Sequence, residues 1–208
     1  MNNIVEKNEI LFAKNCYVCN MELFRKIRLK RGMSLLRKRA GDIKRNKFKG
    51  NLADVKSIGI VWDATRTSDF QYLAQFHQKM QEKGVDVKII GYYPDKILPD
   101  RITAIRYLSC LKKNDLNYFY LPTSEEAENF IKTRFDVLID VNFNDLLPLQ
   151  YITAMSVASL KIGLFNEGNN SYLFDMMIDL NKNSKISDYF DHILHYLEMI
   201  NNPAYIKN

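Results

Sequence analysis

The chain has 208 residues, a formal net charge of +6 and 47% hydrophobic residues, which is enough apolar material for one globular domain with an appendage. Eight glycines and five prolines exclude a collagen-like or low-complexity protein, and no uncharged apolar run is long enough to predict a membrane span. Three cysteines exclude a disulfide framework, and the polar start Met1-Asn2-Asn3 lacks the order of a secretory signal. We therefore expect a cytoplasmic protein.

The positive charge is concentrated in one segment near the N-terminus. Residues 21–50 contain twelve lysines and arginines against two acidic residues, so this segment carries +10 while residues 51–208 carry −4. Its apolar residues are spaced loosely at three and four positions, which predicts an amphipathic helix with interruptions at Gly32 and Gly41. The sequence thus predicts an acidic domain preceded by a basic helical arm.

Three roles are open for a basic helix of this kind. It can contact the phosphates of RNA, on the ribosome or free, or of DNA; it can lie on an anionic membrane; or it can pack its apolar stripe on its own domain and leave its cations in solvent. The excess of cations over acids is larger than solubility requires, which favours contact with an anion. The residues expected to make this contact are Arg25, Arg28, Arg31, Arg37, Lys38, Arg39, Lys44 and Arg45.

From Ser57 onward, short β-branched runs alternate with segments of helical period, which predicts an α/β domain with a mostly parallel sheet. Gly84 is expected to end the first helix of this domain. The stretch 102–121 is ambiguous. In chain order, the elements expected in the first half are a strand at 58–62, a helix from about 68 to 84, a strand at 85–91 and a short strand near 107.

The pattern is clearer in the second half. Ser124, followed by two glutamates, is typical of a helix start. The elements expected here are a helix from 124, a buried strand at 135–141, a helix at 146–157, strands at 160–165 and 173–178, and a closing helix from about 187 that ends before Pro203.

These elements predict a single three-layer Rossmann-like or flavodoxin-like domain over residues 51–202. It is expected to follow an N-terminal extension (1–20) and the basic arm (21–50), and to precede a short tail (203–208). Right-handed crossovers place the loops that follow the strands at one end of the sheet, where open α/β domains bind ligands. The polar residues of these loops are therefore candidates for a small-molecule site: Asp63, Thr65, Arg66, Asp140, Asn142 and Asn166.

The chemistry of these loops is open to two interpretations. The loop after Asp63 precedes a helix N-terminus and contains Arg66, which favours an anion, but it lacks the glycine spacing of phosphate-binding loops. The alternative is structural: Asp63 turns the chain, and Thr67 or Ser68 caps the helix.

The loop after Asp140 is also open to two interpretations. Asp140, Asn142, Asn144 and Asp145 offer oxygen ligands of the type that magnesium prefers, yet Asp145 is equally placed to cap the next helix. We assign no catalytic residue, metal or cofactor. Cys16 and Cys19 form a lone C-x-x-C pair whose role stays open.

Several segments together resemble a known family. They are the basic opening helix, IGIVWDAT (58–65), KKNDLN (112–117) before Tyr118, FDVLID (135–140), PLQYITAMS (148–156), KIG (161–163) and DMMI (175–178). This order, over residues 21 to about 201, is similar to a family of Bacteroidota proteins of about 200 residues, a domain of unknown function. The resemblance implies a Rossmann-like fold and a cytoplasmic setting, and it implies no activity. Cys16 and Cys19 lie outside it.

Residues 135–163 also resemble part of the acceptor-side domain of heptosyltransferase-like glycosyltransferases. In that domain a strand ending in Ile-Asp is followed by a helix and then by a strand with Arg or Lys before Ile-Gly. The likeness implies a related fold, because such enzymes need a second Rossmann-like domain for the donor and 208 residues do not hold both.

The sequence indicates a non-enzymatic binding protein that contacts nucleic acid or the ribosome through its basic arm. Two alternatives remain open. One is an enzyme or sensor that binds a nucleotide or sugar phosphate at the sheet-end loops, and the other is peripheral attachment to an anionic membrane. The oligomeric state is not predicted.

Overall fold

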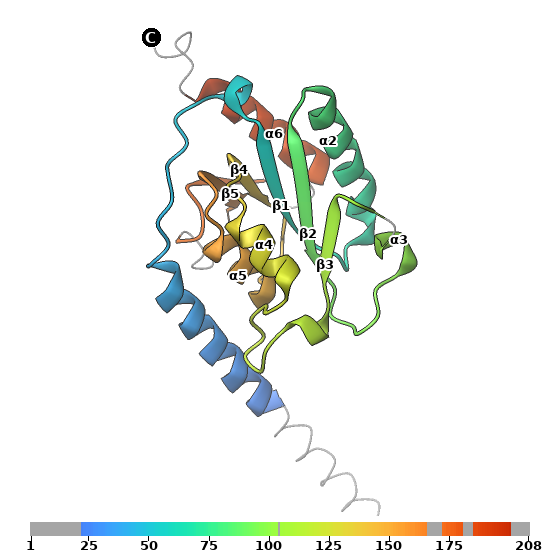
Figure 1. Ribbon diagram of the computed structural model, residues 1–208, viewed down its shortest axis with the longest axis vertical. Helices are drawn as coiled ribbons and strands as arrows, with labels where there is room; N and C mark the ends of the chain where they lie inside the picture. The colour runs from blue at the N-terminus through green and yellow to red at the C-terminus, as the bar shows by residue number, and fades with distance from the viewer. Residues whose placement is uncertain (1–21, 104, 166–171, 181–184, 201–208) are drawn as a thin grey trace, which may run out of the picture.

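The computed structural model describes residues 22–103, 105–165, 172–180 and 185–200. Six parallel strands form one sheet in the order β3-β2-β1-β4-β5-β6 (Figure 1). Of the two α/β arrangements expected from the sequence, this is the Rossmann order rather than the flavodoxin order. None of the helices in the described residues is long and apolar enough to cross a lipid bilayer.

The first half of the sheet consists of β1 (Ser57–Asp63), β2 (Asp86–Tyr92) and β3 (Leu108–Leu111). The helix between the first two strands, α2 (Phe70–Glu82), follows a short 3-10 turn, η2 (Thr67–Asp69). Gly84 follows this helix with a φ of +74°, a conformation that favours glycine, so the predicted helix stop is confirmed. The ambiguous region begins within the short helix α3 (Asp100–Thr103), which precedes β3.

The second half contains α4 (Glu125–Lys132), β4 (Val137–Asp140), α5 (Leu147–Met155), β5 (Leu160–Leu164), β6 (Met176–Ile178) and α6 (Ile186–Met199). The predicted start of α4 is confirmed, because the Ser124 hydroxyl accepts a hydrogen bond from the amide of Ala127. All four residues of β4 are buried, as expected for a central strand with helices on both faces. The strand β6 is shorter than the predicted 173–178.

Helices cover both faces of the sheet (Figure 1). On one face α2 and α6 pack against the strands; Phe76 and Phe190 stack with ring centroids 4.1 Å apart. On the other face α4 and α5 cover β1, β2 and β4 through a second cluster that includes Phe130 and Phe135. Burial of these side chains supplies the main stabilisation of the domain, and it fixes the strand ends at which loop residues meet.

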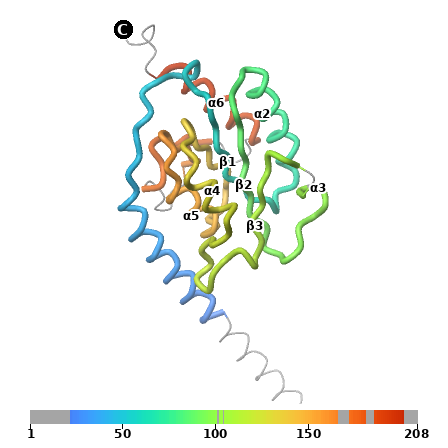
Figure 2. Tube along the Cα trace, in the orientation of Figure 1, coloured from blue at the N-terminus to red at the C-terminus, as the bar shows by residue number. Residues whose placement is uncertain are grey.

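Residues 22–40 are helical and form a further layer outside α5; we call them the basic helix. Leu36 is fully buried in a cluster with Leu121, Leu147 and Leu173. Figure 2 follows the chain from the end of the basic helix along the side of the domain to η1 (Leu52–Asp54). The C-terminal part of the apolar stripe therefore packs on the protein's own domain, whereas Leu23, Phe24 and Ile27 are exposed.

The predicted interruption at Gly32 is wrong, because the helix runs through this residue. Gly32 is buried, and a β-carbon there would collide with the carbonyl oxygen of Phe119 and the side chain of Leu147. Glycine is thus needed for close approach of the helix to the domain, not for a break. Gly41 lies in the turn that follows the helix, so the predicted interruption at this residue is confirmed.

Candidate functional site

The first candidate site lies where the strand order reverses, at the carboxyl ends of β1 and β4. The buried Asp63 ends β1, and its Oδ1 accepts hydrogen bonds from the Thr65 amide (3.0 Å) and hydroxyl (2.6 Å). Arg66 forms an ion pair with the buried Asp69, Nε to Oδ2 2.7 Å. Asp63 therefore turns the chain, as the structural interpretation predicts. Neither Thr67 nor Ser68 caps α2: its N-cap residue is Asp69, which makes no capping hydrogen bond with its side chain, so this prediction is wrong.

The β4 side of this site is organised around Asp140. Its Oδ2 accepts from the Thr153 hydroxyl at 2.7 Å, and its Oδ1 accepts from the amide (3.1 Å) and the side-chain Nδ2 (2.6 Å) of Asn142. Asn142 Nδ2 also donates to the carbonyl of Val61, which connects the β4 loop to β1. Asp145 does not cap α5, because the N-cap residue is Leu146; Asp145 instead accepts from Gln150.

Burial raises the pKa of Asp140 to about 6, although the hydrogen bonds from Thr153 and Asn142 oppose this shift. The hydroxyl of Tyr189 on α6 donates to the backbone carbonyl of Asp140, and burial raises the pKa of this tyrosine. Asp140 is thus held by neighbours from the loop after β4, from α5 and from α6, which is the environment of a structural carboxyl group.

The two loops meet through Arg66, whose guanidinium lies 4.2 Å from the centroid of the Phe143 ring. The cavity beside Asp140 and Asn142 has a volume of about 20 Å³, which accommodates one water molecule and not a nucleotide. Those of the predicted loop residues that the structure describes therefore cluster at the switch point, as the sequence predicts. Most of their hydrogen-bonding groups are occupied by one another, although Asn142 Oδ1 is buried without a hydrogen-bond partner in the described residues, and the space for a ligand is small.

The second candidate site is the outer surface of the basic helix and of the segment that follows it. Ten of the twelve basic side chains of residues 22–50 are exposed, and Arg28 and Arg45 are half-buried. Within the described residues, Arg45 alone of the twelve has a carboxylate within 4.0 Å. The cations that have neither a carboxylate nor a hydrogen-bond partner there are Arg25, Lys26, Lys30, Arg31, Arg37, Lys38, Lys44, Lys47 and Lys49.

Three of the predicted anion-contacting residues have structural partners instead. Arg28 donates to the carbonyl of Tyr118 at 2.7 Å. Arg39 donates to the Tyr151 hydroxyl at 3.3 Å, and Arg45 is paired with Asp175. The other five, Arg25, Arg31, Arg37, Lys38 and Lys44, remain available at the surface.

Aromatic side chains lie among these cations. The guanidinium of Arg28 lies over the rings of Tyr118 and Tyr120, 4.2 and 4.5 Å from the ring centroids. Arg37 lies 5.7 Å from the centroid of the Tyr172 ring. Tyr118 and Tyr172 are 63% and 42% exposed, so each presents part of its ring to solvent beside the basic helix. Proteins that bind single-stranded nucleic acid combine cations and exposed rings in one surface.

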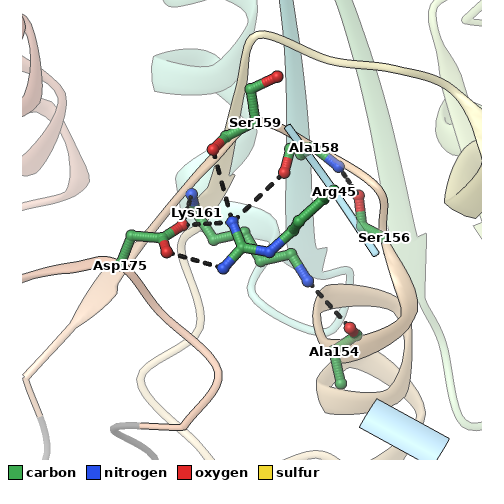
Figure 3. Close-up of polar contacts among 7 residues, drawn as sticks. All are labelled: Arg45, Ala154, Ser156, Ala158, Ser159, Lys161 and Asp175. Carbon is green, nitrogen blue, oxygen red and sulfur yellow. Dashed lines mark hydrogen bonds and ion pairs between the residues drawn. The ribbon is translucent and has the colours of Figure 1, made fainter. Parts of the chain in front are cut away.

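A buried lysine lies next to this surface (Figure 3). Lys161 on β5 is 3% exposed, and its Nζ donates to the carbonyl of Ala154 at 2.9 Å. Asp175 accepts two hydrogen bonds from Arg45, at 2.6 and 2.7 Å, and a third from the Lys161 amide. The pKa of Lys161 is lowered to about 7, mainly by burial and also by the charge of Arg45, while the charge of Asp175 opposes the shift. Burial raises the pKa of Asp175, but its contacts with Arg45 and Lys161 outweigh burial and lower it overall.

Sequence reasoning missed Thr153, Lys161 and Asp175. Two of them left a signal in the sequence, since Thr153 interrupts an apolar helix and Lys161 interrupts an apolar strand. A polar residue inside a buried element needs a partner, although the sequence does not say which one. The predictions for Asn166, Cys16, Cys19, the extension 1–20 and the tail 203–208 lie outside the described residues.

Fold and sites together define a Rossmann-order α/β domain that carries a cationic helix as an additional outer layer. The chain belongs to the DUF6913 family, a family of unknown function, which matches residues 28–200. The match begins within the basic helix, so the part of the helix that packs on the domain belongs to the family's common unit. A comparison with curated proteins finds no match.

Proposed function

We propose that this protein is a non-enzymatic binding protein that contacts single-stranded RNA through the outer surface of the basic helix. The observation that carries the proposal is the set of exposed cations without carboxylate partners in residues 22–50. Such cations release counterions from a phosphate backbone when they bind it, which makes binding favourable and strongly salt-dependent.

Two further observations support RNA over a small ligand. Tyr118 and Tyr172 expose their rings beside Arg28 and Arg37, and each ring provides a surface on which a base can stack. At the switch point, by contrast, the cavity beside Asp140 accommodates a single water, and the acidic Asp69 at the start of α2 disfavours a phosphate there. A nucleotide or sugar phosphate at the sheet-end loops is therefore the less supported alternative.

We propose the more detailed expectations from the sequence together with RNA binding. They are a cytoplasmic location, an origin in Bacteroidota, contact with the ribosome or with DNA, and a likeness of residues 135–163 to the acceptor-side domain of heptosyltransferase-like enzymes. Phosphate-directed contacts do not distinguish RNA on the ribosome from free RNA or from DNA, because all three present the same backbone charge.

Replacement of Lys30, Arg31 and Lys38 with glutamine tests the proposal, since all three are exposed and without a carboxylate partner in the described residues. Each phosphate contact to a single strand contributes about 0.7 to the slope of log K against log salt. We expect the triple variant to lose about 2 units of slope and to bind a fluorescent 20-nucleotide RNA roughly 50-fold more weakly at 0.15 M salt. Fluorescence anisotropy between 50 and 300 mM salt measures both quantities.

The matched control removes three exposed lysines of the domain, Lys83, Lys88 and Lys96, by the same substitution. This control lowers the net charge equally and leaves the basic helix intact. We expect its affinity to stay within about threefold of the wild type, since distant charges are screened beyond about 8–10 Å. An equal loss in both variants, or a wild-type affinity that barely changes with salt, contradicts the proposal.

An anionic membrane surface is the second candidate, and one specific observation favours it. Leu23, Phe24 and Ile27 of the basic helix are 54–60% exposed and are surrounded by cations, as in helices that lie in a lipid headgroup region. If this candidate is correct, the protein floats with vesicles that contain phosphatidylserine, and Phe24→Ser with Ile27→Ser abolishes flotation without changing RNA affinity. Failure to float with these vesicles rejects this candidate.

A further inference from the structure

We infer that a pocket beside the segment after the basic helix binds one phosphate group of the same RNA chain; this inference rests on the proposed function. The pocket has a volume of about 350 Å³ and is lined by residues from three parts of the chain. Its charged lining residues are Lys44, Arg45, Lys132 and Arg134, and none of its lining residues is acidic.

Three loops build the pocket. The segment after the basic helix contributes Lys44, Arg45 and Asn46. The end of α4 and the turn into β4 contribute Lys132 and Arg134. The turn between α5 and β5 contributes Val157 and Ser159. The amide of Phe48 donates to the carbonyl of Ser159, which holds the first segment against the last. The pocket is therefore built by the fold and not by mobile side chains alone.

Arg45 anchors one wall of the pocket, and Figure 3 shows the contacts that hold it. Its guanidinium forms two hydrogen bonds with Asp175, and its Nη1 also donates to the carbonyls of Ala158 and Ser159 at 3.4 and 3.5 Å. A guanidinium held in this way keeps its orientation when an anion enters, so less conformational entropy is lost on binding.

The net charge of the groups around the pocket indicates the charge of the anion that it would bind. Four cations line the pocket, Asp175 neutralises Arg45, and Glu128 pairs with Lys132 at 2.8 Å. The C-termini of α4 and α5 near the pocket contribute roughly half a negative charge each. About one positive charge remains, which matches one phosphodiester group. The volume also leaves room for the attached sugar, with Val157 as an apolar contact.

The position of the pocket links it to the basic helix. Lys44 follows the helix by four residues, and the chain continues from the helix along the same side of the domain (Figure 2). A strand of RNA that follows the cations of the helix toward its C-terminal end therefore meets the pocket next. The pocket would fix the register of the RNA, since a seated phosphate is more localised than a phosphate on an open surface.

The test is a pocket variant with Lys44→Gln, Lys132→Gln and Arg134→Gln. These three side chains are exposed, so folding should be preserved, and an unchanged thermal transition checks this. Arg45 is left in place because it pairs with Asp175. With the 20-nucleotide RNA probe, we expect the slope of log K against log salt to fall by about 0.7 and the affinity at 0.15 M salt to fall about fourfold.

The controls separate failure of the pocket from failure of the proposed function. If wild-type protein does not bind RNA with a salt-dependent affinity, the proposed function fails. If wild type binds, the helix variant loses affinity and the pocket variant keeps the wild-type slope, the pocket inference alone is overturned. A second variant, Lys44→Arg with Lys132→Arg, keeps the charge and should keep the wild-type slope; loss of slope in this variant also overturns the inference.

A direct titration with a free anion distinguishes an RNA phosphate from a free phosphate as the occupant of the pocket. Sodium pyrophosphate is titrated into wild type and the pocket variant at constant ionic strength, with binding followed by calorimetry. We expect no saturable binding to either protein below millimolar concentration, because a single phosphate contact is weak without the rest of the RNA. Micromolar binding to wild type that the pocket variant loses would show a site for a free anion, and it would overturn the assignment to RNA.

Discussion

Substitution of Gly32 by alanine should destabilise the protein by roughly 2 kcal/mol, the cost of forcing one extra carbon into a close-packed contact. The new β-carbon would collide with the backbone carbonyl of Phe119, which cannot rotate away as a side chain can. The sign of the change in unfolding free energy distinguishes a packed helix from a free one. In a free helix the same change would stabilise by about 0.5–1 kcal/mol, because glycine is a poor helix former. Urea unfolding measures the difference.

Gly41→Ala is the matched control, because a β-carbon at Gly41 would have its nearest neighbour, the carbonyl of Lys38, at 3.9 Å. We expect its unfolding free energy to stay within about 0.5 kcal/mol of the wild type. Limited trypsin digestion gives a second readout, since the basic helix is rich in arginine and lysine. Faster cleavage in residues 25–39 of Gly32→Ala than of Gly41→Ala indicates that the helix has undocked. Equal cleavage together with a stabilised Gly32→Ala would contradict the packed arrangement.

A packed basic helix changes how its charge is interpreted. A free arm can wrap around its partner, whereas a helix held by Leu36 and Gly32 presents its outer face in a fixed orientation. The cations on that face are therefore preorganised, and binding costs less conformational entropy than ordering a flexible arm would. The match of the family to residues 28–200 fits this view, because it takes in Gly32 and Leu36 together with the domain.

Features that depend on neighbours in the sequence were predictable. Ser124 caps α4 and Gly84 ends the helix before β2, because both depend on backbone groups a few residues away. The parallel sheet followed from the alternation of apolar strands and helices. The order of its strands did not, since pairing of β1 with β4 joins residues about 80 positions apart and leaves no local pattern.

In the candidate sites, too, features set by local sequence or topology were predictable, and features set by distant contacts were not. The clustering of Asp63 and Asp140 at one end of the sheet followed from parallel topology alone. The partner of Asp140, Thr153, belongs to α5, and no spacing rule connects the two residues. Gly32 was misjudged because a glycine in a helical pattern usually indicates an interruption, whereas here the deciding contact is with Phe119, far away in the chain.

Lys161 should make the stability of the protein rise with pH between about 7 and 10. Its pKa is about 7 in the folded protein, whereas a lysine in the unfolded chain has a pKa near 10.4. In this interval the unfolded state binds a proton that the folded state does not bind, so the free energy of unfolding increases as the pH rises. Between pH 7 and pH 9 the increase from this residue should be roughly 2 kcal/mol.

Lys161→Met isolates this contribution, because methionine fills similar space without a charge. We expect the variant to be more stable than wild type at pH 7 and to approach it at pH 9, when Lys161 is neutral in the folded wild type. Cys110, whose thiol pKa burial raises to about 12, is common to both proteins, so its contribution cancels in the difference. Lys88→Met is the matched control, because it removes a lysine at an exposed strand position. If Lys161→Met is instead destabilised equally at both pH values, Lys161 remains charged in the folded protein, and its contacts with Ala154 and Asp175 compensate for its burial.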